Sequence, residues 1–100
     1  MTYESLDSVL QPWVVAHQLN LVTEFKDEPT RSVNVTSRDG RQKVQIWIDR
    51  PRPGAPLSLH VWDYRKRREE IRGSIMEFPE LLERAYALAA SWLAAADSTR

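Results

Sequence analysis

Apolar and polar residues alternate along two segments on either side of residues 39–40, and this is the clearest pattern in the chain. Strict alternation is typical of strands with one buried face. The dipeptide Asp-Gly at 39–40 favours a two-residue type I′ hairpin turn. A hairpin centred there pairs Val35 with Val44 and Val33 with Ile46, so apolar side chains meet on one face. A shift of one residue would put them on opposite faces, so the pattern fixes the register.

A third alternating segment, 57–62, follows a loop at 50–56 whose three prolines disfavour regular strand pairing. Pairing this segment antiparallel to the second strand gives one aliphatic face, made of Val33, Val35, Val44, Ile46, Ile48, Leu57, Leu59 and Val61. The opposite face then carries Trp47 and Trp62 close to Gln45 and His60. Large exposed aromatic rings on an otherwise polar face are typical of contact surfaces.

Helices are predicted at both ends of the chain. Residues 2–20 carry apolar side chains at helical spacing, and Pro12 predicts either a kink or a second helix starting near it. A second helix is predicted from Pro79, because proline suits the first helical position. Its apolar stripe is Leu81, Leu82, Ala85, Leu88, Ala89 and Trp92.

Two remaining segments are harder to assign. Residues 21–25 are predicted as a short strand, closed by the polar stretch 26–31. Residues 64–75 form a loop or a frayed strand extension. The predicted fold is therefore a two-layer α+β domain, with an antiparallel three- or four-stranded β-meander and both terminal helices on one face. Its order is α-β-β-β-α, or α-β-β-β-β-α with a fourth strand. We expect one globular domain over 1–96 and a disordered tail at 97–100.

Composition narrows the classes of protein to which the chain is expected to belong. There is no cysteine, no apolar run of about 18 residues and no basic leader with a cleavage site near the N-terminus. We therefore expect a cytoplasmic protein with no membrane contact. The net charge is zero, but residues 1–30, 31–72 and 73–100 carry −4, +6 and −2. This asymmetry either steers a charged partner or pairs one layer with the other.

Catalytic and metal-binding patterns are sparse. His17 and His60 are the two histidines, and metal sites usually require several convergent ligands, so we predict no metal and no cofactor. On a strand, His60 and Asp63 point to opposite faces and make a poor acid–base pair. No serine has the context of a nucleophile, and no glycine-rich phosphate loop is present. The expected protein is not an enzyme.

Three interpretations of the aromatic face remain open. The first is protein association, with a second copy or a dedicated partner, because tryptophan and arginine are enriched at binding hot spots. The second is binding of nucleic acid, single-stranded or RNA, by stacking aromatics and the basic run 65–68. The third is burial of the face under the first helix or the loop 65–76. The predicted interaction residues are Lys43, Gln45, Trp47, His60, Trp62, Tyr64, Arg65, Lys66, Arg67 and Arg68.

Overall fold

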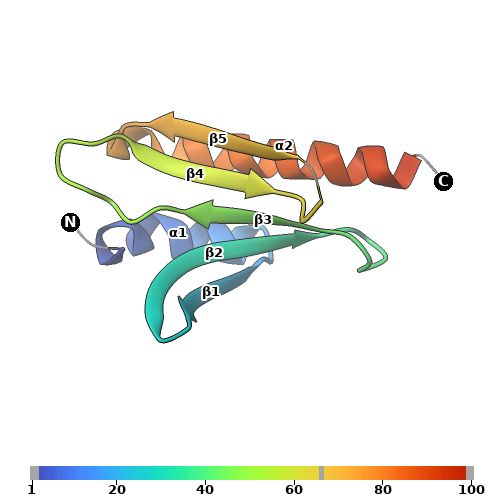
Figure 1. The fold of residues 1–100 in the computed structure, drawn as a ribbon, viewed down its shortest axis with the longest axis horizontal. Helices are drawn as coiled ribbons and strands as arrows, with labels where there is room; N and C mark the ends of the chain where they lie inside the picture. Colours follow the sequence, from blue (N-terminus) through green and yellow to red (C-terminus); the bar gives the residue numbers. More distant parts are fainter. Residues whose placement is uncertain (1–2, 66, 99–100) are drawn as a thin grey trace.

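The computed structural model describes residues 3–65 and 67–98, which form one five-stranded sheet and two long helices (Figure 1). The elements in chain order are α1 (Glu4–Ala16), β1 (Asn20–Phe25), β2 (Glu28–Thr36), β3 (Lys43–Ile48), β4 (Leu57–Trp62), β5 (Arg68–Gly73), a short 3-10 helix (Ile75–Glu77) and α2 (Phe78–Ser98). Neighbouring strands pair antiparallel in the order β1-β2-β3-β4-β5. The predicted α+β meander is confirmed, with one strand more than the largest number predicted.

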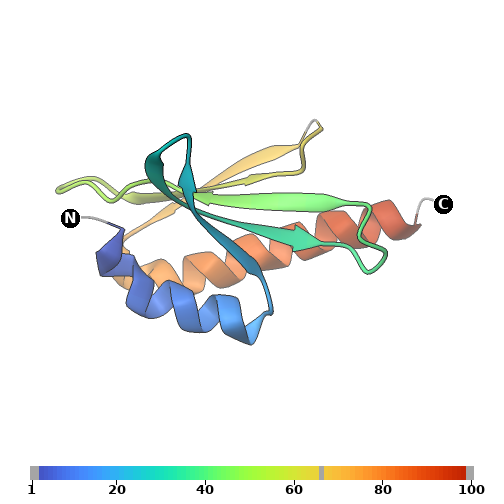
Figure 2. The same cartoon turned by 90° about the horizontal axis from the view of Figure 1, so that it is seen from below.

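Both helices pack on the same face of the sheet (Figure 2), which we call the inner face. All eight predicted aliphatic sheet residues are buried there, against apolar side chains of the helices such as Leu6, Leu10, Phe78 and Leu82. No helix among the described residues is long and apolar enough to cross a membrane.

The predicted strand registers are confirmed. In the β2–β3 pair, Val35 faces Val44 and Val33 faces Ile46. In the β3–β4 pair, Gln45 faces Trp62 and Trp47 faces His60. The match between the apolar positions of neighbouring strands was therefore sufficient to align them.

The predicted type I′ turn at residues 39–40 is wrong. The last backbone hydrogen bond of this hairpin runs from Ser37 N to Gln42 O, at 2.9 Å, and leaves a four-residue loop at 38–41. Of the two central residues, Gly40 alone has a positive φ, 75°. Asp39 accepts hydrogen bonds from the Ser37 hydroxyl and the Arg41 backbone N–H, at 2.7 and 3.0 Å. These side-chain bonds stabilise the wider turn without changing the register.

A two-residue turn with both φ angles positive occurs instead at Lys26 and Asp27, whose φ angles are 52° and 66°. These angles are typical of the type I′ hairpin. Strand β1 confirms the predicted strand at 21–25. The polar stretch 26–31 was predicted to close this strand, but only residues 26–27 form the turn, because β2 begins at Glu28. Strand β2 includes Pro29, which lies opposite Glu24 next to an irregularity in the β1–β2 pairing. Proline is tolerated at such irregular positions.

Strand β5 lies within the segment predicted as a loop or frayed strand extension. Its pairing with β4 places Ile71 opposite Leu59, and Ile71 is the buried residue of the strand. The other side chains are mostly charged, which is common on exposed edge strands because charge discourages pairing with further chains. A single buried position gives too weak an alternation to predict this strand.

Helix α1 is continuous through Pro12, so the predicted second helix beginning there does not form. Pro12 and Ser8 are both exposed, so water can bond the backbone carbonyl that proline leaves unpaired. At the other end of the chain, Ser74 and Glu77 form a capping box just before α2. Helix α2 begins at Phe78, next to the predicted Pro79. Residues 99–100 of the predicted tail, 97–100, lie outside the described residues.

Candidate functional site

The face of the sheet opposite the helices, here called the outer face, is the candidate site. Strands β3, β4 and β5 contribute to it the side chains Gln45, Trp47, Ser58, His60, Trp62, Arg68, Glu70 and Arg72. Helix α1 packs on the inner face, and residues 68–73 lie in the sheet beside β4 (Figure 2). The third interpretation, in which one of these segments buries the aromatic face, is therefore wrong for the described residues.

The rings of Trp62 and Tyr64 form an exposed, tilted pair on this face. The ring centroids lie 4.4 Å apart with an interplanar angle of 41°. The exposed fractions are 37% for Trp62 and 44% for Tyr64. The Tyr64 hydroxyl donates a 2.9 Å hydrogen bond to Asn34 Oδ1, and partial burial raises the pKa of Tyr64. The hydrogen bond to β2 and the stacking hold the two rings in a defined orientation.

Trp47 lies on the same face but is only partly exposed. It lines a shallow hollow of about 230 Å³ together with Gln45, Asp49, His60, Trp62 and Arg68. The predicted grouping of Trp47, Trp62, His60 and Gln45 is thus present as the wall of this hollow. The ring next to Trp62 is that of Tyr64, which is also among the predicted interaction residues.

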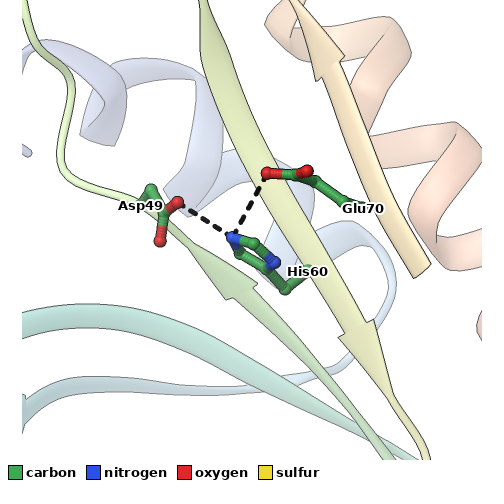
Figure 3. A group of neighbouring side chains, drawn as sticks. All are labelled: Asp49, His60 and Glu70. Atoms are coloured by element: carbon green, nitrogen blue, oxygen red, sulfur yellow. Dashed lines mark hydrogen bonds and ion pairs between the residues drawn. The ribbon is translucent and has the colours of Figure 1, made fainter. Parts of the chain in front are cut away.

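Three side chains from neighbouring segments converge beside this hollow (Figure 3). His60 Nε2 lies 2.9 Å from Asp49 Oδ2 and 3.8 Å from Glu70 Oε2. Glu70 also accepts a 2.6 Å hydrogen bond from the Ser58 hydroxyl and forms an ion pair with Arg72, at 3.0 Å. The Ser58 hydrogen bond, then the Arg72 contact, hold the pKa of Glu70 below its usual range.

Sequence reasoning missed this group because its members are far apart in the chain. His60 was predicted to lie on the outer face, but Asp49 falls just after β3, and Glu70 belongs to the strand that was not predicted. The register of β5, which sets Glu70 opposite His60, was the missing information. Among the described residues, His60 pairs with Asp49 and not with Asp63, which instead binds Arg67.

The basic run 65–68 does not form one surface. Arg68 lies opposite Trp62 on the outer face. Arg67 forms an ion pair with Asp63 at 3.1 Å, and its guanidinium lies 5.0 Å from the ring centroid of Trp92, a residue of the inner layer. Arg65 is exposed beside Tyr64, and Lys66 lies outside the described residues.

The second histidine belongs to a different cluster, between the two helices. His17 Nε2 lies 3.0 Å from Glu83 Oε1, and the imidazole ring lies 4.2 Å from the ring of Tyr86. Glu83 also accepts a 2.9 Å hydrogen bond from Trp13 Nε1. This cluster joins α1 to α2 and has one carboxylate where the His60 group has two.

Comparisons with protein-family models, with curated proteins and with solved structures found no match. The functional argument therefore rests on the geometry of the outer face.

Proposed function

We propose that the outer face of the sheet binds another protein, and that the bound segment is acidic and carries an apolar side chain. The observation that supports this most directly is the tilted Trp62–Tyr64 ring pair, left exposed on a sheet face that neither described helix covers. Preordered aromatic rings offer a large apolar contact area at a small entropic cost, and such residues dominate binding energy in many interfaces.

The acidic character of the partner follows from the charges around the rings. Asp49 lies 2.9 Å from His60 Nε2, and Glu70 forms an ion pair with Arg72. Lys43 and Arg68 are exposed at the same end of the outer face as Trp62, and neither forms an ion pair with another described residue. Positive charge therefore remains available beside the rings, and complementary carboxylates on a partner would speed encounter and fix orientation.

The same charges argue against a second copy of the chain as the partner. A two-fold symmetric interface brings the same patch of both subunits together. The exposed side chains Lys43 and Arg68 beside Trp62 are both positive, so two such patches would repel each other at these residues. The basic excess instead favours an unlike partner with the opposite charge.

Nucleic acid fits the outer face less well than an acidic protein segment. Base stacking requires ring faces that are open to the base. Here the rings of Trp62 and Tyr64 lie against each other with centroids 4.4 Å apart, and the Tyr64 hydroxyl is bound to Asn34. Arg67 is paired with Asp63 and turned toward Trp92, which removes a charge from the predicted phosphate-binding run.

The proposal can be tested with a random copolymer of glutamate and tyrosine as a model acidic segment. We expect it to bind the chain in low salt, with a change in tryptophan fluorescence, at least tenfold more tightly than polyglutamate binds. Trp62→Ala and the double variant Lys43→Glu with Arg68→Glu should each weaken binding at least tenfold, which corresponds to about 1.4 kcal/mol. Arg84→Glu is the matched control, because Arg84 is exposed on α2 away from this face, and it should bind almost as the wild type does.

Several results would contradict the proposal. Equal binding of polyglutamate and the copolymer would show that charge alone acts. Tighter binding of an oligouridylate, lost in Trp62→Ala, would assign the face to nucleic acid. A mass of twice 11.6 kDa by light scattering, reduced to 11.6 kDa by Trp62→Ala, would assign it to a homodimer. Binding that Arg84→Glu weakens as strongly as the outer-face variants do would show that the face is not involved.

A further inference from the structure

Three metal-ligating side chains meet on the outer face without any of the sequence spacing that usually marks a metal site. Asp49, His60 and Glu70 each offer one ligand atom, and these atoms all lie within 4.8 Å of one another (Figure 3). They come from the segment after β3, from β4 and from β5. We propose that these three side chains bind a zinc ion, with water as the fourth ligand.

The separations of the ligand atoms are close to those of a zinc centre. Zinc binds histidine nitrogen and carboxylate oxygen at about 2.0–2.2 Å, so neighbouring ligands of a tetrahedral site lie about 3.4 Å apart. The observed distances from His60 Nε2 are 2.9 Å to Asp49 Oδ2 and 3.8 Å to Glu70 Oε2. The two distances lie on either side of the ideal value, so small side-chain rotations bring all three atoms into place.

The His60 ring is directed correctly for this role. Its Nε2 faces both carboxylates, one on each side, as Figure 3 shows. Three protein ligands leave the fourth position of a tetrahedral zinc ion to water or a substrate.

Outer contacts hold one of the ligands in position. Glu70 Oε2 accepts a hydrogen bond from the Ser58 hydroxyl, and Glu70 Oε1 contacts Arg72. Hydrogen bonds to the ligating groups orient them, and losing such partners commonly weakens metal binding 10- to 100-fold. A neighbouring hollow, lined by Asp49 and Glu70, is bordered by Arg50, Arg52 and Arg72. The positive charges of these arginines repel a cation, so all three ligands are needed to bind the zinc ion.

This inference does not depend on the proposed protein partner, because it rests on different side chains. Trp62, Tyr64, Lys43 and Arg68 are the residues of the proposed docking surface, whereas Asp49, His60 and Glu70 are the proposed ligands. The two experiments therefore alter different side chains and have separate readouts, zinc binding in one and copolymer binding in the other.

The test is a calorimetric titration of the untagged chain with zinc chloride, in parallel with the single variants His60→Gln, Asp49→Asn and Glu70→Gln. We expect one zinc per chain, a rise in Tm on saturation, and binding weakened at least tenfold in each variant. Cobalt(II) should occupy the same site and give the visible absorption of a tetrahedral centre. Magnesium should not compete, because it favours sites composed entirely of oxygen ligands.

The chain contains its own matched control. His17 also has a carboxylate 3.0 Å from Nε2, that of Glu83, but it lacks a second one in a corresponding position. His17→Gln should therefore bind zinc as the wild type does. Circular dichroism should show that every variant is folded. The inference is wrong if the wild type binds no zinc at millimolar concentration, if His17→Gln abolishes binding, or if the three ligand variants bind as tightly as the wild type.

Discussion

Replacing Phe78 by alanine is expected to lower the free energy of unfolding by about 3–5 kcal/mol, the usual cost of removing a large buried aromatic side chain. Phe78 is 1% exposed and belongs to the core between the sheet and the helices. It also starts α2 directly after the Ser74–Glu77 capping box. Truncation therefore leaves a cavity at the point where the second helix is attached to the sheet. Chemical denaturation followed by tryptophan fluorescence measures the change.

The matched control is the other phenylalanine of the chain. Phe25 lies at the tip of the β1–β2 hairpin and is 56% exposed. Phe25→Ala should change the free energy of unfolding by no more than about 0.5 kcal/mol, as is usual for surface substitutions. Equal losses in the two variants would mean that Phe78 does not lie in the core as described.

The sequence was sufficient to predict the central sheet because its strands carry several apolar residues each. Alternation in β2 and β3, centred on the turn at 39–40, matched Val33 to Ile46 and Val35 to Val44, and a shift of one residue would have moved these side chains to the other face. Strand β5 could not be predicted in the same way, because Ile71 is its one buried residue. Its charged residues are compatible with an edge strand and with a solvated loop alike.

Turn geometry was predicted less well than strand pairing, for a local reason. The dipeptide Asp-Gly favours a type I′ turn, but the Asp39 carboxylate binds the Ser37 hydroxyl and the Arg41 backbone N–H, which stabilises a longer loop. The type I′ angles occur at Lys26 and Asp27, where the sequence carries no glycine to indicate them. Side-chain hydrogen bonds of this kind are not apparent from dipeptide preferences.

The outer face was predicted in part. The alternating pattern placed Trp47, Trp62 and His60 together, because their grouping depends only on the register of β3 and β4. It could not supply Asp49 and Glu70, which depend on the loop after β3 and on β5. The basic run 65–68 was predicted as part of the interaction surface from its place in the sequence, and of its described residues Arg67 lies against Trp92 in the inner layer. Chain neighbours in a turn need not share a face.

A second large effect is expected from Arg31→Met, which removes the main polar link between α1 and the sheet. Arg31 makes two hydrogen bonds to the carboxylate of Asp7, at 2.9 and 3.0 Å, and another to the Thr30 carbonyl, at 2.7 Å. Its guanidinium also lies 5.1 Å from the ring centroid of Tyr3. The side chains of Arg31 and Asp7 are 12% and 22% exposed, so water compensates only partly for the loss. We expect the free energy of unfolding at pH 7 to fall by about 2–3 kcal/mol.

The pH dependence of unfolding distinguishes loss of this ion pair from simple loss of packing. The hydrogen bonds from Arg31 hold the pKa of Asp7 below its ordinary value of 3.8 in the folded chain. The unfolded chain therefore binds more protons than the folded chain in this range. The stabilisation is complete above the ordinary pKa and is lost as the pH falls through the lowered one. Chemical denaturation between pH 6 and about pH 2 should show a steeper loss of stability in the wild type than in Arg31→Met.

Arg72→Met is the matched control, because Arg72 is 63% exposed and pairs with Glu70 on the surface. Solvent screens exposed pairs strongly, so this variant should unfold almost as the wild type does at pH 7. If Arg31→Met kept the wild-type acid dependence, the Asp7 carboxylate would not depend on Arg31 for its stabilisation. If Arg72→Met were as unstable as Arg31→Met, the difference in burial between the two ion pairs would not determine how much each contributes to stability. If Arg31→Met were as stable as the wild type, the apolar stripe of helix α1, with Leu6, Leu10 and Trp13, would supply most of its attachment.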